Sequence, residues 1–257
     1  MYSSSSEESS FLEPHLPLVG MAKEKQRLIR AFNNREPIMV MGCPGSGKTR
    51  LIKESLASNK SVLFIGWQQP LHALLVALAR ALIATHHADF LRRAKLSTDR
   101  NAWLANQTSI HLKGLLWSAL ENLPVPIVLD GISGSSLPTY RFLQRIYYTP
   151  GMALFGASRD SSSLGALGRL FWHPANLLKL PPLREPEAGR LFEEAAGHFG
   201  LRDLNLNEFR KKVLASARGN PGQIIEMCRL AAEPKYVSGR YVKFSLLRID
   251  AMTKFAV

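Results

Sequence analysis

The chain of 257 residues has 46% hydrophobic and 21% charged residues, a composition typical of a soluble globular protein long enough to bury a core. Thirty-three Lys and Arg against 20 Asp and Glu give a formal net charge of +13, which favours an acidic partner, above all nucleic acid. With two cysteines, Cys43 and Cys228, the chain has neither a disulfide framework nor a cysteine-built zinc site. Its longest apolar stretch is interrupted by Arg80 and is shorter than the roughly 20 residues that span a bilayer.

The N-terminal segment, residues 1–15, is rich in serine and glutamate, and this composition predicts a disordered tail. It has neither a basic start nor an apolar stretch, so it is not a secretory signal, and we expect a cytoplasmic protein. The next stretch predicts a helix over residues 21–32, because Leu28, Ile29 and Phe32 recur on one face.

Five short apolar runs then predict buried strands, and stretches with helical spacing lie between them. Alternation of this kind indicates a parallel sheet with both faces covered. Two of the helices are expected over residues 71–94 and 108–123, separated by a polar segment at residues 97–106. The predicted strands fall within residues 36–42, 60–66, 125–131, 151–158 and 175–183.

The pattern changes after the pair Pro181-Pro182. Three helical stretches follow one another with no strand between them, at residues 185–200, 207–219 and 221–233. We therefore expect an α/β domain over residues 16–182, a helical domain over 183–234, and a basic tail over 235–257 for which the sequence predicts no element.

The stretch GCPGSGKT matches the phosphate-loop pattern G-x-x-x-x-G-K-[ST] and lies between a predicted strand and a predicted helix, as that motif requires. Glycines allow backbone N–H groups to turn toward a phosphate, and the N-terminus of the following helix adds its positive dipole. Lys48 is expected to neutralise the β- and γ-phosphates, and the Thr49 hydroxyl to bind Mg²⁺. The predicted nucleotide-binding residues are Gly42, Cys43, Pro44, Gly45, Ser46, Gly47, Lys48, Thr49 and Arg50.

An acidic residue outside the phosphate loop completes this prediction. Asp130 ends the apolar strand PIVLD and is the candidate that organises Mg²⁺ together with Thr49. About eighty residues and one strand separate the two motifs, which indicates a P-loop ATPase with an added central strand. A small-molecule kinase is disfavoured, because its lid interrupts the α/β core, whereas the helices here follow that core.

Four further stretches, LPLVGMAKEKQRL, LFGASRD, LGALGRLFWHPANLLKLPPLREPEAGRLF and ARGNPGQIIEMCRLA, together make the chain resemble the AAA+ and STAND-like ATPases. The likeness is to compact bacterial and archaeal members related to initiator-loading, transposition-regulator and secretion-type ATPases. It spans most of residues 16–232. We expect a three-layer α/β P-loop domain with parallel strands in the order 5-1-4-3-2, followed by a helical lid, with ATP and Mg²⁺ as cofactors.

The resemblance also implies roles for individual side chains. Ser158 would contact the attacking water or the γ-phosphate. Arg169 would be the arginine finger that reaches the nucleotide of a neighbouring subunit, with Arg159 as the alternative. The lid arginine of many AAA+ members is absent, since Gly222 stands at its position, and Met21 replaces the usual arginine of the entry helix.

The largest departure follows Asp130, where STAND-like members often read D-G-h-D-E and this chain reads DGISG. Gly131 occupies the AAA+ position of the catalytic glutamate. Gln68 and Gln69 are candidates to orient water in its place. We therefore expect weak intrinsic hydrolysis and a module that assembles or changes shape on ATP, with a non-hydrolysing adaptor that recruits a protein partner as the alternative.

Partners are predicted mainly from charge. Basic residues with interleaved Tyr236, Tyr241 and Phe244 make the lid and tail candidates for nucleic-acid contact, and a solvated basic face is the alternative reading. A homo-oligomer and a separate protein that carries the output are also expected, and a membrane partner is not.

Overall fold

The computed structural model describes residues 16–57, 59, 62–95 and 99–254. The predicted N-terminal tail lies outside these residues. The chain divides into two compact units. One is an α/β unit of Ala22–Cys43 and Lys48–Pro181, and the other contains Pro44–Gly47 and the helices after Pro182.

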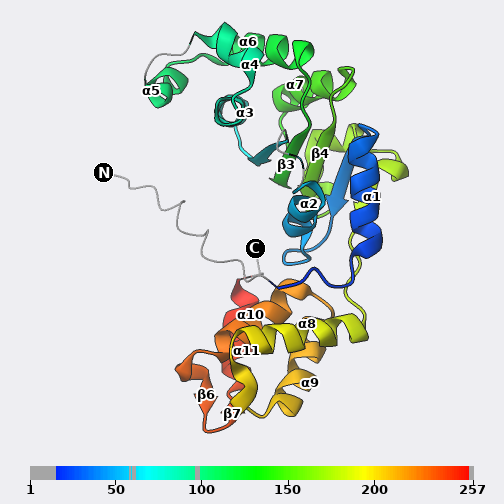
Figure 1. The fold of residues 1–257 in the computed structure, drawn as a ribbon, viewed down its shortest axis with the longest axis vertical. Coiled ribbons are helices and arrows are strands. Elements are labelled where there is room, and N and C mark those ends of the chain that lie inside the picture. Colours follow the sequence, from blue (N-terminus) through cyan, green and yellow to red (C-terminus); the bar gives the residue numbers. More distant parts are fainter. Residues whose placement is uncertain (1–15, 58, 60–61, 96–98, 255–257) are drawn as a thin grey trace. The chain divides into compact units, whose positions relative to one another are not determined.

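The α/β unit is built on five parallel strands in the order β2-β3-β4-β1-β5 (Figure 1). Read from the other edge this is the predicted order 5-1-4-3-2, so the predicted fold is confirmed. The strands are β1 (Ile38–Met41), β2 (Leu63–Gly66), β3 (Ile127–Ile132), β4 (Leu154–Ser158) and β5 (Leu177–Lys179).

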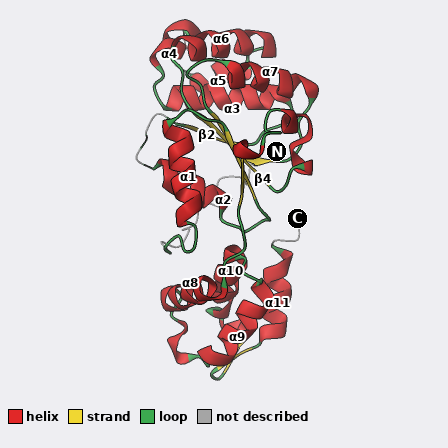
Figure 2. Cartoon of the chain, turned by 90° about the vertical axis from the view of Figure 1, so that its right-hand side faces the viewer, coloured by secondary structure: helices red, strands yellow, loops and turns green. Residues whose placement is uncertain are grey.

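Helices cover both faces of this sheet (Figure 2). Alternate strand residues such as Met39 and Leu129 join a core with helices on one face, and Phe32 packs on Phe155, with ring centroids 5.8 Å apart, on the other. Burial on both faces explains why the strands are apolar runs without alternation. The helices are α1 (Ala22–Asn33), α2 (Lys48–Leu56), α3 (Leu71–Ala84), α4 (Ala88–Ala94), α5 (Arg100–Ala105), α6 (Ser109–Asn122) and α7 (Leu137–Tyr148), with 3-10 helices η2 (Ser162–Arg169) and η3 (Pro174–Asn176).

The continuous helix predicted over residues 71–94 is wrong. The chain bends by 114° between α3 and α4, because His86 takes a left-handed φ of 52° and His87 Nδ1 accepts the N–H of Phe90 to cap α4. The polar segment before α6 likewise contains α5, which begins after the cap Asp99. Among the described residues no single helix is long and apolar enough to cross a membrane, although α3 and α4 taken together have that length and composition.

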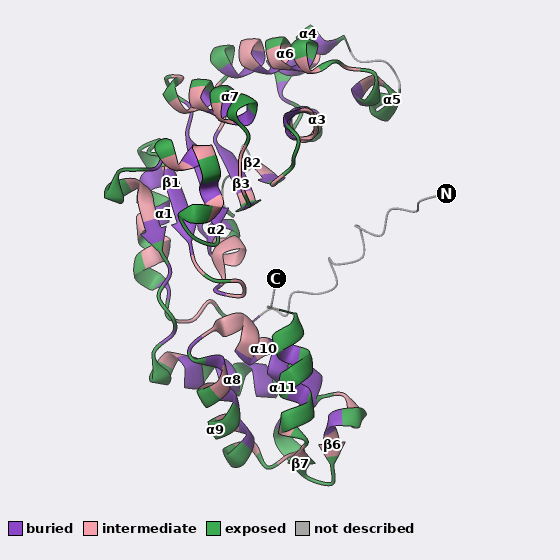
Figure 3. Ribbon diagram, turned by 180° about the vertical axis from the view of Figure 1, so that it is seen from behind, coloured by how far each residue is buried: buried purple, intermediate pink, exposed green. Residues whose placement is uncertain are grey.

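The helical unit contains α8 (Glu185–His198), α9 (Leu206–Ala217) and α10 (Pro221–Ala231), which lie on the three predicted helical stretches. The segment after them forms a short hairpin, β6 (Val237–Ser238) and β7 (Tyr241–Val242), and α11 (Phe244–Thr253). Tyr236, Leu247 and Ala251 are buried in the same core as α8 and α10, and Figure 3 shows the buried side of α11 beside α10. This segment is therefore an integral part of the helical core.

Candidate nucleotide-binding site

The phosphate loop connects β1 to α2, and the side chain of its lysine, Lys48, bonds to the backbone of the loop. Lys48 Nζ donates hydrogen bonds to the carbonyl oxygens of Gly42, at 2.7 Å, and Cys43, at 3.0 Å. Burial lowers the pKa of Lys48 below its ordinary value, while the Asp130 carboxylate acts in the opposite direction. A bound phosphate would add negative charge and favour the protonated ammonium further.

The remaining loop residues are held in different ways. Ser46 is buried, and its hydroxyl has no hydrogen-bond partner within the described part of the chain. Cys43 is exposed. Arg50, on the first turn of α2, forms an ion pair with Glu54 at 2.8 Å. An unpartnered hydroxyl in a loop rich in N–H donors fits an anionic ligand with acceptor oxygens.

Thr49 and Asp130 meet although 81 positions separate them. The Thr49 hydroxyl lies 3.0 Å from Oδ1 and 2.8 Å from Oδ2 of Asp130. The carboxyl ends of parallel strands share one edge of a sheet, which brings the end of β3 to the start of α2. A hydroxyl and a carboxylate supply the hard oxygen donors that Mg²⁺ prefers, so these residues fit the predicted metal.

The backbone beside Asp130 is irregular. Leu129 pairs with Gly156 and Ile132 with Ser158, so two residues of β3, Asp130 and Gly131, oppose a single residue of β4. This is a β-bulge, a feature that re-aims side chains next to functional sites. Gly131 has a φ of 76°, a left-handed conformation that costs other residues about 1–2 kcal/mol. At Gly131, where the resemblance places a catalytic glutamate, the backbone therefore takes a conformation that suits glycine.

Ser158 lies at the end of β4, beside the start of the phosphate loop. Its main-chain carbonyl accepts the N–H of Gly42 at 3.3 Å. Its side chain is buried, and the hydroxyl donates to the carbonyl of Ile132 at 2.8 Å. To contact a nucleotide, as the resemblance implies, this hydroxyl would have to exchange Ile132 for the new partner.

The two candidate arginine fingers differ in their surroundings. Arg159 is 62% exposed and lies 3.9 Å from Asp160. Arg169 ends η2 and is exposed, and within the described ranges no ion pair holds it. Of the two candidates, Arg159 is the one with a carboxylate beside it among the described residues.

The two glutamines after β2, Gln68 and Gln69, also differ in their surroundings. Gln69 Nε2 donates to the carbonyls of Ser133, at 3.1 Å, and Gly134, at 2.9 Å. Its amide therefore braces the loop that follows Asp130. Gln68 is exposed and remains the candidate for orienting water.

Two contacts that the sequence did not predict hold the tip of the phosphate loop against α10, within the same compact unit. Asn220 Nδ2 donates to the Pro44 carbonyl at 2.9 Å, and the N–H of Gly222 donates to the Gly45 carbonyl at 2.8 Å. A β-carbon on Gly222 would lie 2.7 Å from Gly45 Cα. The residue that replaces the usual lid arginine thus allows a close backbone approach.

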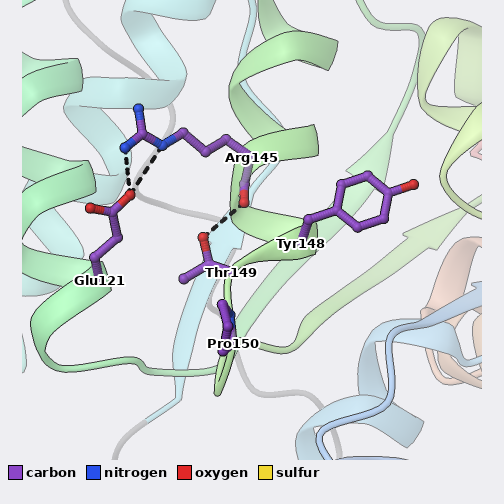
Figure 4. Close-up of a pocket in the computed structure, with 5 residues that line it drawn as sticks. All are labelled: Glu121, Arg145, Tyr148, Thr149 and Pro150. Carbon is purple, nitrogen blue, oxygen red and sulfur yellow. Dashed lines mark hydrogen bonds and ion pairs between the residues drawn. The ribbon is translucent and has the colours of Figure 1, made fainter.

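A cavity of about 450 Å³ lies away from all these residues, at the end of α7 (Figure 4). Arg145 donates to one oxygen of Glu121 at 3.1 and 2.5 Å and stacks on the Trp117 ring at 4.2 Å. The charges that line this cavity neutralise each other, and none of the predicted nucleotide-binding residues belongs to it. The remaining lining residues are Tyr148, Thr149 and Pro150.

No family model and no curated protein matches this sequence. The fold, by contrast, is shared with solved P-loop ATPases. Cdc6p from Pyrobaculum aerophilum superposes with a TM-score of 0.62 at 12% identity, covering 88% of this chain and 65% of its own. A Walker-type ATPase of Pyrococcus abyssi also gives 0.62, at 13% identity, covering 93% of this chain and 71% of its own.

A third similar structure is a STAND protein with a tetratricopeptide repeat sensor from Pyrococcus horikoshii. Its TM-score is 0.52 at 15% identity, and the match covers 98% of this chain and 34% of the other. The chain thus spans about a third of that protein and 65% of Cdc6p. These likenesses confirm that the fold is that of the AAA+ and related P-loop ATPases.

Proposed function

We propose that this chain is an ATP-binding P-loop ATPase module with weak intrinsic hydrolysis, which serves as a nucleotide-dependent switch in a nucleic-acid-linked assembly. The observation that carries the proposal is the pair formed by Thr49 and Asp130 at the end of the phosphate loop, next to the bulge at Gly131. The pair supports binding of nucleotide with metal. The bulge argues against fast hydrolysis.

Each residue has a defined task in this proposal. Lys48 would leave the carbonyls of Gly42 and Cys43 for the β- and γ-phosphates, an exchange of neutral partners for charged ones. Thr49 and Asp130 would hold Mg²⁺, which when bound neutralises phosphate charge. The Ser46 hydroxyl would gain an acceptor oxygen that it lacks among the described residues.

Weak hydrolysis follows from the missing base. A general base typically contributes about 10²–10⁴ in rate, and Gly131 carries no side chain to supply one. Gln69 is occupied by the carbonyls of Ser133 and Gly134. Turnover would then depend on Gln68, on Arg169 reaching the nucleotide of a second subunit, or on a group that a partner brings.

Charge supports the nucleic-acid link, and the basic residues are not confined to the predicted lid and tail. Residues 22–181 hold 20 Lys and Arg against 8 Asp and Glu, whereas residues 182–254 hold 13 against 9. Both stretches carry an excess of basic residues, and the larger excess lies in residues 22–181. Cations on both units would release counterions on contact with a phosphate backbone, which makes affinity fall steeply with salt.

The deciding experiment is Mg-ATP turnover by the purified chain with and without duplex DNA, with Lys48→Ala as the blank. We expect ATP binding, turnover close to the blank without DNA, and stimulation by DNA whose affinity falls steeply in a log–log plot against salt. Fast turnover without DNA would contradict the role assigned to Gly131. Absence of ATP binding would overturn the proposal altogether.

A non-hydrolysing adaptor is the second candidate, and one observation favours it. Leu246, Ile249 and Met252 recur at helical spacing on the outer face of α11 and are 48%, 65% and 46% exposed. An apolar stripe in contact with water is typical of a surface that binds protein. ATP-dependent binding of a protein partner, lost when Ile249 becomes Lys, with no turnover and no DNA affinity, would favour the adaptor.

A further inference from the structure

The loop that follows the bulge in β3 is hydrogen-bonded to η2, the 3-10 helix that carries Arg169. The N–H of Gly134 donates to the Ser163 carbonyl at 2.5 Å. The Ser135 hydroxyl donates to the Leu164 carbonyl at 2.9 Å and accepts the N–H of Leu167 at 3.0 Å. One hydroxyl thus bridges the carbonyl of Leu164 and the N–H of Leu167, the two groups that a single 3-10 turn would otherwise pair with each other.

Both ends of this connection are themselves held in place. On the β3 side, Gln69 braces the loop through the carbonyls of Ser133 and Gly134, and the Ser158 hydroxyl holds the Ile132 carbonyl. Ser135 is five residues beyond Asp130 and three beyond Ile132, the last residue of β3, so the loop directly continues the strand that carries the carboxylate proposed to bind Mg²⁺. A shift of the bulge would therefore move Ser135.

On the η2 side, the Asp160 carboxylate accepts from the Ser162 hydroxyl, at 2.6 Å, and from the Ser163 N–H, at 2.8 Å. The backbone of η2 is kinked at Gly165, with φ 56° and ψ −133°. At that kink it approaches the Ser135 backbone so closely that a β-carbon would lie 2.9 Å from Ser135 N. Leu167, whose N–H meets the hydroxyl, is two residues before Arg169.

We propose that Ser135 is a positioning residue that couples the state of the metal-binding end of β3 to η2, and thereby sets the position of Arg169. This inference rests on the proposed function, since it names the path by which bound nucleotide would alter the finger segment. The DGISG stretch, which lacks the usual acids, would then serve as a mechanical connection in place of a catalytic one. Such a link would transmit a shift of β3 to η2, because the carbonyl of Leu164 and the N–H of Leu167 both bond to the Ser135 hydroxyl.

The test is amide hydrogen exchange of η2 in the full chain, measured with no nucleotide, with ATP plus EDTA, and with Mg-ATP. We expect Mg-ATP to change the exchange of the Leu167 amide and its neighbours in the natural chain. In Ser135→Ala, Mg-ATP should bind with an unchanged affinity, and η2 should exchange at one rate in all three conditions. Ser135→Thr retains the hydroxyl and should restore the response.

Ser163→Ala is the matched control, because it removes a hydroxyl of η2 whose hydrogen bond, among the residues that the structure describes, goes to Asp160 and not to the loop after β3. It should keep the response to Mg-ATP. If Ser135→Ala keeps that response, the proposal is overturned, and if it loses affinity for Mg-ATP in step with its Tm, Ser135 is merely structural. A natural chain that binds Mg-ATP with no change in η2 overturns the coupling alone, whereas one that binds no Mg-ATP overturns the proposed function itself.

Discussion

The N–H of Gly222 donates to the carbonyl oxygen of Gly45 at 2.8 Å, so the first turn of α10 touches the tip of the phosphate loop. The cap residue Asn220 acts beside it, since its amide nitrogen donates to Pro44 while its Oδ1 accepts the N–H of Gln223. The turn that begins a helix thus also supports the loop predicted to hold phosphate. Position 222 has a structural requirement that excludes the arginine seen in many AAA+ members.

Gly222→Ala should weaken ATP binding at least about tenfold, which corresponds to about 1.4 kcal/mol. The added methyl group would lie 2.7 Å from Gly45 Cα and 2.9 Å from its carbonyl oxygen, so the loop must move. Equilibrium binding of a fluorescent ATP analogue measures this effect. Gly197→Ala is the matched control, because a β-carbon at that helical position meets nothing within 4 Å. Equal affinities of the two variants would show that the close approach is unimportant.

Gly131→Glu should fail to create a fast ATPase, although it places an acid at the position of the AAA+ catalytic glutamate. The left-handed backbone, with φ 76°, should instead lower the free energy of unfolding by about 1–2 kcal/mol. Gly131→Asn should cost less, since asparagine tolerates this conformation better. Steady-state turnover and urea unfolding of both variants check this. A tenfold rise in turnover of the glutamate variant would mean that the bulge rearranges readily.

Leu247→Ala should destabilise the helical unit by about 2–5 kcal/mol, as expected for a buried leucine. Leu247 is fully buried in the core shared with α8 and α10. Leu246→Ala, one position earlier and 48% exposed, is the control and should change stability little. Thermal unfolding of both variants measures the difference. Equal Tm values would show that α11 contributes little to the fold.

Acid should loosen the start of η2. Hydrogen bonds from Ser162 and Ser163 lower the pKa of Asp160 to about 2. Because the folded pKa lies below the ordinary value of about 3.9, the carboxylate stabilises this segment above pH 4, and the stabilisation is lost as pH falls toward 2. An NMR titration of the Asp160 carboxyl carbon measures the pKa directly. Asp160→Asn should remove the pH dependence of the Ser163 amide, and a pKa near 3.9 in the natural chain would contradict the prediction.

The sequence by itself determined the features that are written in contiguous residues. The phosphate loop from Gly42 to Thr49, the apolar strands and the three helices after Pro182 each depend on local spacing and on burial of one face or both. Alternation of strands and helices, joined to a resemblance spanning most of the chain, also predicted the order 5-1-4-3-2. The loop, the strands and the helices follow from short-range chemistry that a single segment carries, whereas the strand order rests on the resemblance.

Tertiary structure decided what depends on register and on distant partners. The bulge at Asp130 and Gly131 arises from pairing with β4, and the Ser135 bonds require η2 to lie beside the β3 loop. The sequence also did not predict the break at His86 or the packing of α11. Helical apolar spacing continues on both sides of His86, and the basic residues around α11 hide the pattern of its buried face. A residue meets such partners only after the chain has folded, so their identity is a property of three-dimensional packing and has no local signal.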